Sequence, residues 1–202
     1  MAPEDTVPGW RFWLQWVLVS CVGYAVGCLA GFVLGHLLLG NVMIGIGTGA
    51  VTGLLQWLLL RRYIRQSGWW VLASTLGLGV SLGLYGIVHL VWMVPFHMGW
   101  PLGILGWGLA YLLGGALVGL PQQRILRRSL ARSAWWVPVS AAGWALSVLG
   151  TAIQPTDSHL PTVLIILRNG MAGPAVAGII LGIITGAGLV WLLRQPIPAK
   201  QQ

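Results

Sequence analysis

Six long apolar stretches constrain this chain more than any other feature of its sequence. Each stretch has about 20 or more mostly apolar residues, the length that an α-helix needs to cross the hydrocarbon core of a bilayer. The six are residues 12–36, 41–60, 69–93, 101–121, 135–154 and 173–193. Backbone amides in hydrocarbon must be satisfied within their own segment, and runs of this length are too long for the strands of a membrane barrel. The stretches therefore predict transmembrane helices.

The scarcity of charge supports the same prediction. The 202 residues include only three acidic and eleven basic side chains, and 57% of them are hydrophobic. A water-soluble domain needs roughly a quarter of its residues charged. We therefore predict an all-α membrane protein with six transmembrane helices, forming a single integral-membrane domain over residues 1–202. The N-terminus has no basic cluster and no small-residue cleavage site, so the first stretch is expected to be a permanent span.

The basic residues predict the orientation of the spans. With six spans, ten of the eleven fall on one side of the membrane, and only Arg168 falls on the other. The ten are Arg11, Arg61, Arg62, Arg65, Arg124, Arg127, Arg128, Arg132, Arg194 and Lys200. Because loops rich in arginine and lysine stay in the cytoplasm, both termini are predicted to be cytoplasmic, in a bacterial inner or photosynthetic membrane. The basic residues are dispersed over loop ends, which argues against nucleic-acid binding.

Tryptophans follow the same division. Two lie near the opposite ends of the spans, Trp92 and Trp100. Seven lie near the basic ends: Trp10, Trp13, Trp69, Trp70, Trp135, Trp136 and Trp191. Because indole rings favour the membrane interface, these positions predict two tryptophan belts, and the alternative is an aromatic cage for a cation or ligand.

An internal repeat organises the chain. The segment GAVTGLLQWLLLRRYIRQSGWWVLASTLG, residues 49–77, aligns without gaps on residues 115–143 at a constant offset of 66. The aligned pairs include Gln56 with Gln122, the Arg pairs, the Trp pairs and Ser74 with Ser140. Parts of the same pattern occur at both ends of the chain. In the C-terminal copy, Leu189 stands at the expected glutamine position. We predict three tandem parallel two-helix repeats, at about 12–62, 69–128 and 135–194.

These repeated Q-W-L-x-L-R-R and W-W motifs resemble those of a group of small multi-pass membrane proteins of cyanobacteria and related bacteria. The resemblance covers nearly the whole chain. It implies the repeated architecture and carries no activity with it.

Glycines recur at every fourth position in three of the predicted spans. The stripes are Gly23, Gly27, Gly31 and Gly35; Gly45, Gly49 and Gly53; and Gly178, Gly182 and Gly186. Such GxxxG patterns let helix backbones approach closely. Close packing within the bundle is the preferred interpretation, and a pore lining or a groove for a partner subunit is the alternative.

Two glutamines and two arginine pairs form the candidate polar positions near the basic interface. Gln56 and Gln122 lie about one turn inside it and are expected to form interhelical hydrogen bonds, or else to contact a polar head group. The pairs Arg61–Arg62 and Arg127–Arg128 are expected to contact the phosphates of anionic lipids.

Histidines offer the sharpest hypothesis for a cofactor. His36, His89 and His97, together with His159, are predicted at the non-cytoplasmic face. Imidazoles there could ligate a haem iron, a chlorophyll magnesium or a transition metal, so haem, chlorophyll and carotenoid stay open as ligands. The alternative is that these histidines bond to water, backbone or lipid at the interface. No sequence signature of a dedicated metal site supports the first hypothesis.

The sequence gives little support for catalysis. Glu4, Asp5 and Asp157 are the only carboxylates, and none lies inside a predicted span, so we predict no enzyme. The outer segment 155–170 contains an apolar run too short to span, which predicts an interfacial or re-entrant loop.

Three functional hypotheses follow. The first is a non-enzymatic accessory or assembly subunit of a larger membrane complex, with a photosynthetic complex as one candidate, bound to another membrane protein or to further copies of itself. The second is a binder or carrier of an apolar or amphipathic ligand, and the third is a channel or transporter for small neutral solutes.

Overall fold

The computed structural model describes residues 8–35, 40–64, 67–96, 100–152 and 162–195, and only the backbone over 88–107 and 151–169. Every regular element in these ranges is helical, which confirms the all-α prediction. The α-helices are α1 (Trp10–Gly35), α2 (Asn41–Leu60), α3 (Trp69–Phe96), α4 (Trp100–Leu126), α5 (Trp136–Ala152) and α6 (Thr162–Leu193), with a short 3-10 helix, η2 (Ser133–Trp135), before α5.

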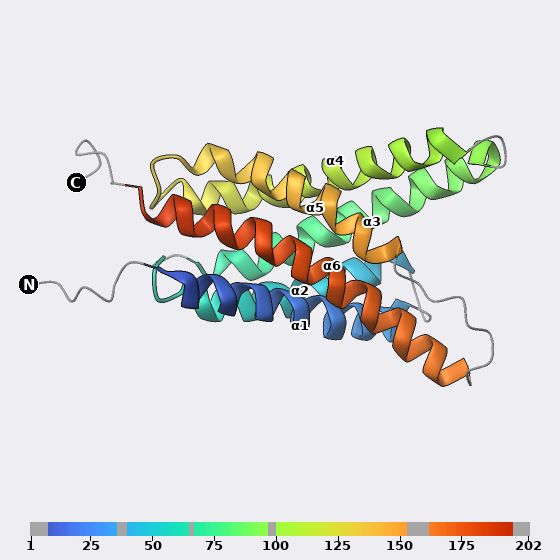
Figure 1. Cartoon of the computed structure of the whole chain (residues 1–202), viewed down its shortest axis with the longest axis horizontal. Helices are drawn as coiled ribbons and strands as arrows, with labels where there is room; N and C mark the ends of the chain where they lie inside the picture. The colour runs from blue at the N-terminus through green and yellow to red at the C-terminus, as the bar shows by residue number, and fades with distance from the viewer. Residues whose placement is uncertain (1–7, 36–39, 65–66, 97–99, 153–161, 196–202) are drawn as a thin grey trace, which may run out of the picture.

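The helices form a closed ring in which each one packs against the helices that precede and follow it in the chain. The ring closes because α6, the last helix, packs along α1, the first. Successive helices run in opposite directions, so α1 begins and α6 ends at the same end of the molecule (Figure 1). At that end the Arg194 side chain donates a hydrogen bond of 3.2 Å to the Pro8 carbonyl, which joins the two terminal segments.

Four of the helices are long and apolar enough to cross a membrane when the described residues are considered: α1, α2, α3 and α6. This supports an integral membrane protein. Large apolar side chains are exposed along the outside of the ring, among them Leu18, Leu76, Leu84, Leu109 and Leu149. In water such a surface would be costly, whereas lipid solvates it well.

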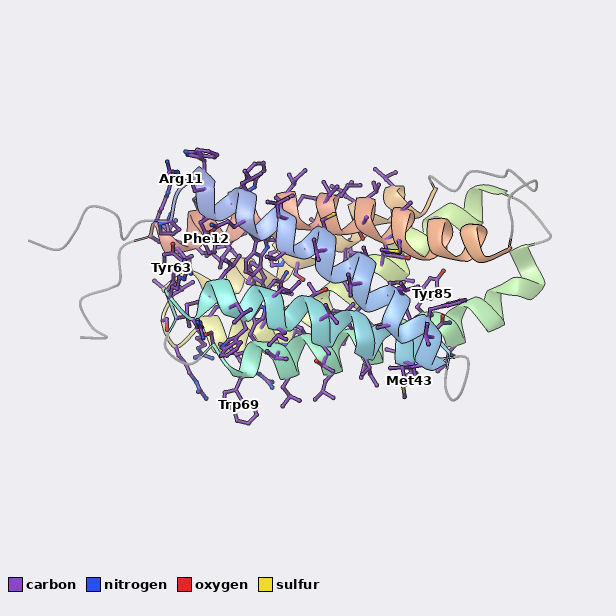
Figure 2. The ribbon with its side chains drawn as sticks, turned by 90° about the horizontal axis from the view of Figure 1, so that it is seen from below. Arg11, Phe12, Met43, Tyr63, Trp69 and Tyr85 are labelled. Atoms are coloured by element: carbon purple, nitrogen blue, oxygen red, sulfur yellow. The ribbon has the colours of Figure 1, made fainter. Side chains whose placement is uncertain are left out.

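All arginines with described side chains lie at one end of the ring, which we call the basic end. They are Arg11, Arg61, Arg62, Arg124, Arg127, Arg128, Arg132 and Arg194. Figure 2 shows Arg11, Tyr63 and Trp69 at this end and Met43 and Tyr85 toward the other. Arg168 lies in the first turns of α6 and therefore at the opposite end.

Helix α6 corrects one sequence prediction. Residues 162–170 were expected to belong to an outer loop, but α6 begins at Thr162 and continues to Leu193 without interruption. The expected interfacial or re-entrant location of these residues stays a prediction. The apolar run after Pro161 supports a helix, and Pro174 is tolerated inside it because neighbouring groups can satisfy the carbonyl that it leaves unpaired. The run is thus the beginning of the last helix.

Apart from Gly35, whose surroundings the structure does not describe, the glycines of the stripes face neighbouring helices of the same chain. A Cβ atom placed on Gly49 of α2 would lie 2.7 Å from Thr75 Cα of α3, and one on Gly182 of α6 would lie 2.9 Å from Val17 Cα of α1. Likewise, a Cβ on Gly27 of α1 would lie 2.6 Å from Thr48 Cα of α2. At these points the backbones are too close for any side chain. The glycines therefore set the helix spacing of the ring.

Candidate functional site

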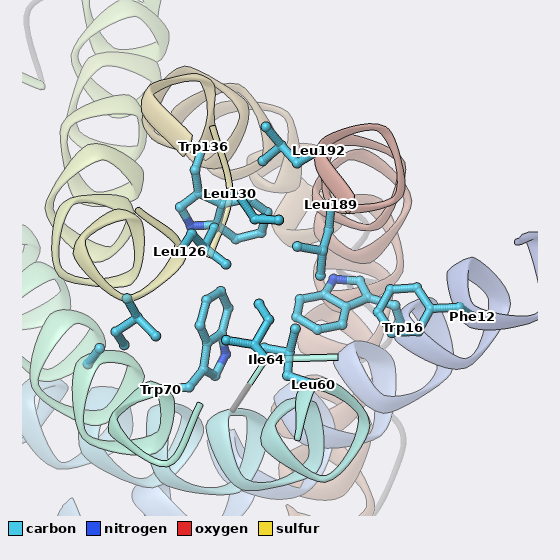
Figure 3. Packing of buried hydrophobic residues seen from close by; sticks show 12 residues of the cluster. Phe12, Trp16, Leu60, Ile64, Trp70, Leu126, Leu130, Trp136, Leu189 and Leu192 are labelled. Carbon is cyan, nitrogen blue, oxygen red and sulfur yellow. The ribbon is translucent and has the colours of Figure 1, made fainter. Parts of the chain in front are cut away.

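Three tryptophans close the interior of the ring near the basic end. Trp16, Trp70 and Trp136 are at most 1% exposed, and their rings converge on the centre (Figure 3). The ring centroids of Trp16 and Trp70 are 6.0 Å apart, and those of Trp70 and Trp136 are 5.5 Å apart. Nine further buried apolar residues complete this cluster, which we call the tryptophan plug: Phe12, Leu60, Ile64, Ala73, Ile125, Leu126, Leu130, Leu189 and Leu192.

The plug corrects the predicted role of two tryptophans. Trp70 and Trp136 were assigned to the interfacial belt, but they are buried, whereas Trp69 and Trp135 beside them are 63% and 58% exposed. Adjacent residues on a helix point about 100° apart, so one indole of each W-W pair faces outward and the other inward. The indoles of Trp10, Trp69 and Trp135 are exposed near the basic end, and their place in a membrane belt stays a prediction.

Gln56 connects three helices through its amide group. The Trp70 indole nitrogen donates a hydrogen bond of 3.0 Å to Gln56 Oε1. Gln56 Nε2 in turn donates one of 3.1 Å to Ser20 Oγ. The amide is 6% exposed and thus bonds α3 and α1 to α2, which is the interhelical role left open by the sequence.

Gln122 makes the same pair of bonds one unit later. Trp136 Nε1 donates a hydrogen bond of 3.0 Å to Gln122 Oε1, and Gln122 Nε2 donates one of 3.0 Å to Ser74 Oγ. These residues connect α5 and α3 to α4. Because Trp70 and Ser74 both belong to α3, the two chains of hydrogen bonds together link α1 through α5.

The corresponding position in α6 is occupied by Leu189, so the third chain of bonds is different. Trp16 Nε1 donates a hydrogen bond of 3.0 Å to Thr185 Oγ1, and that hydroxyl donates one of 2.6 Å to the Leu181 carbonyl. Ser140 is the serine that a glutamine at position 189 would be expected to contact. Its hydroxyl instead donates a hydrogen bond of 2.9 Å to the Gly115 carbonyl. Each buried indole thus keeps an acceptor even without the third amide.

A small polar cavity lies beside the plug, inside the ring. Its volume is about 30 Å³. Its polar lining includes Thr52, Gln56, Ser74, Gln122, Ser140 and Thr185. Leu78, Val118 and Leu181, with the rings of Tyr24 and Trp144, are among the residues that complete it. Within the described ranges, Thr52 Oγ1 is the one buried side-chain oxygen or nitrogen without a hydrogen-bond partner. The cavity has room for one or two waters, which could satisfy this hydroxyl.

The chemistry available in this interior is that of neutral hydrogen bonds. Amides, hydroxyls and indoles line it, and none of these groups exchanges protons readily near neutral pH. Among the described residues, no three His, Cys, Asp or Glu side chains lie close enough to hold a metal ion. The hydrogen bonds of this interior hold neighbouring helices together.

The predicted arginine pairs lie at the surface of the basic end. Arg61, Arg62, Arg127 and Arg128 are all exposed. The Arg61 guanidinium lies 5.6 Å from the centre of the Trp57 ring, a cation–π arrangement. Their expected contact with lipid phosphates stays a prediction.

The histidine hypothesis falls mostly outside the described residues. His36, His97 and His159 lie outside them, and for His89 only its backbone position in α3 is described. The carboxylates Glu4, Asp5 and Asp157 also lie outside the described ranges. The proposed ligation of haem or chlorophyll by His36, His89 and His97 therefore stays a prediction.

Comparisons of this chain with protein-family models, with curated proteins and with solved structures found no match.

Proposed function

We propose that this chain is a non-enzymatic, six-span integral membrane protein that serves as an accessory or assembly subunit of a larger membrane complex. In this proposal the six helices are three parallel two-helix units, and the basic end faces the cytoplasm. In this proposal the protein binds other membrane components through the outer surface of the ring.

The observation that carries the proposal is how closely the described part of the interior, toward the basic end, is packed. Trp70, Gln56 and Ser20 bond to one another, and Trp136, Gln122 and Ser74 do the same. The cavity between them measures about 30 Å³, far below the roughly 300 Å³ at which sites for organic ligands begin. An interior of this kind favours a rigid body that acts through its outer surface.

The positions of these bonds support the three-unit arrangement. Trp70 and Trp136, like Gln56 and Gln122, are separated by the 66 residues of the sequence repeat. The contact of α6 with α1 uses glycines in the same way as the contact of α2 with α3. Repeats with an even number of spans keep the same direction in the membrane, so an axis near the membrane normal would relate the units.

The experiment is an affinity purification of the full chain from its native membrane in mild detergent, followed by mass spectrometry. We expect another membrane protein, or further copies of this chain, to remain bound in a fixed ratio. A homogeneous single chain, recovered alone under several detergents, would count against an accessory role.

Three matched variants identify the face involved. Leu18→Trp on α1, Leu76→Trp on α3 and Leu146→Trp on α5 each enlarge an exposed side chain on a different helix of the ring. A specific subunit contact would be lost in one variant and kept in the other two, while the melting temperature stays the same in all three. Equal loss in all three would indicate non-specific co-purification.

A second candidate function, the binding of an amphipathic lipid, is favoured by a separate observation. An apolar groove opens on the outside of the ring between α5 and α6, close to the basic end.

A further inference from the structure

The groove between α5 and α6 has a volume of about 430 Å³. Its lining consists of Arg132, Trp135, Val139, Ala187, Gly188 and Trp191. Trp135 and Trp191 are 58% and 41% exposed, and their ring centroids lie 6.4 Å apart at an interplanar angle of 85°. The groove is thus open to the surroundings of the ring, with indoles near the basic end.

Small residues of α6 open the groove beside α5. In the repeat alignment, Ala187 and Gly188 correspond to Leu54 and Leu55 of α2 and to Leu120 and Pro121 of α4. Leu54 and Leu120 are 46% and 47% exposed, so large side chains cover the outer face at those positions. The hollow therefore depends on the sequence of the third unit.

The groove is polar at one end and apolar at the other. The Arg132 guanidinium lies 6.0 Å from the centre of the Trp191 ring, a cation–π arrangement that fixes the charge above the groove. Ala187 lies one helical turn deeper than Trp191, about 6 Å along α6. The described residues include no carboxylate that could pair with Arg132.

We infer that this groove binds one phospholipid with an anionic head group. The Arg132 guanidinium pairs with the head-group phosphate, the indoles of Trp135 and Trp191 flank the glycerol region, and one acyl chain lies over Val139, Ala187 and Gly188. The charge complementarity and the order of polar and apolar groups along the membrane depth match a lipid. The inference depends on the proposed membrane orientation of the ring, and it is independent of the accessory role.

The test is a lipid titration of the purified full chain, followed by native mass spectrometry. Phosphatidylglycerol and phosphatidylcholine with identical acyl chains are the two probes. We expect one phosphatidylglycerol to bind more tightly than phosphatidylcholine. Arg132→Gln should weaken phosphatidylglycerol binding roughly fivefold, the effect of removing one arginine near an anionic head group. Ala187→Leu should fill the groove and weaken the binding of both lipids.

Two control variants match these changes elsewhere on the ring. Arg124→Gln removes an exposed arginine at the same end, and Ala172→Leu enlarges an exposed alanine of α6 toward the opposite end. Both should bind phosphatidylglycerol as the unmodified protein does. The inference is overturned if Arg132→Gln and Ala187→Leu bind like these controls, or if soluble glycerol phosphate displaces the lipid. Because only purified protein and lipid are used, a negative result leaves the co-purification test unaffected.

Discussion

The indole nitrogen of Trp70 and the amide oxygen of Gln56 are 3.0 Å apart, and this hydrogen bond joins α3 to α2 in the buried interior of the ring. The side-chain N–H group of Gln56 also donates a hydrogen bond to Ser20 of α1. Both members of the bond are neutral and almost completely buried. Removing one partner would therefore leave the other without a hydrogen bond in an environment that offers few alternatives.

Gln56→Leu should destabilise the ring. The substitution leaves the indole N–H of Trp70 and the hydroxyl of Ser20 without their present partner, at a cost of about 1–3 kcal/mol. Thermal unfolding in detergent, followed by tryptophan fluorescence, measures the loss. In the double variant with Trp70→Phe the two losses should be less than additive, because the donor is already absent. Fully additive losses would show that the bond contributes little.

Leu189→Gln should be tolerated although Leu189 is fully buried. A glutamine there occupies the position of Gln56 and Gln122, where it could accept from the Trp16 indole and donate to Ser140. Leu192→Gln is the matched control, since Leu192 is 1% exposed in the same plug and has no corresponding glutamine in the repeat. We expect a melting temperature near that of the unmodified protein for the first and a loss of at least about 2 kcal/mol for the second. Equal losses would argue against matching interiors in the three units.

Gly49→Ala should disrupt the contact between α2 and α3. The added Cβ would lie 2.7 Å from Thr75 Cα and even closer to the Ser74 carbonyl, so the two backbones would have to separate. Overpacking of this kind costs about 1–3 kcal/mol. Gly108→Ala in α4 is the control, because a Cβ there meets no atom within 4 Å. The melting temperatures of the two variants test this expectation. Similar values for both would contradict the close approach of the α2 and α3 backbones at Gly49.

The sequence was sufficient to predict the helices and much of their packing. The apolar stretches gave six helices, and the spacing of Gly49 and Gly53 indicated a backbone contact. The assignment of Trp70 and Trp136 to the interfacial belt was wrong. Apolar residues cover every face of these helices, so periodicity cannot identify the face that points inward. The bond from Trp16 to Thr185 was also missed, since Leu189 removes the repeat signal that would have indicated an acceptor. The W-W pairs, aligned with a glutamine and a serine, were the available signal for the buried indoles.

The basic end should face the cytoplasm. In a variant lacking Cys21 and Cys28, Tyr63→Cys places a thiol at the basic end, and Asn41→Cys places one at the start of α2, at the opposite end. A membrane-impermeant maleimide added to intact cells should label position 41 and leave position 63 unlabelled until the membrane is permeabilised. The expectation rests on the retention of arginine-rich loops in the cytoplasm. Labelling of position 63 in intact cells would contradict this orientation.

The purified protein should be colourless. In the part of the interior that the structure describes, the tryptophan plug fills the basic end, and the cavity of about 30 Å³ beside it cannot hold a porphyrin or a carotenoid. An absorption spectrum of protein extracted in mild detergent from its native membrane tests this expectation, with the aromatic band alone as the expected result. A visible band would instead support the cofactor hypothesis. Its loss in His36→Ala and His89→Ala, with the melting temperature unchanged, would then assign the ligands to these histidines.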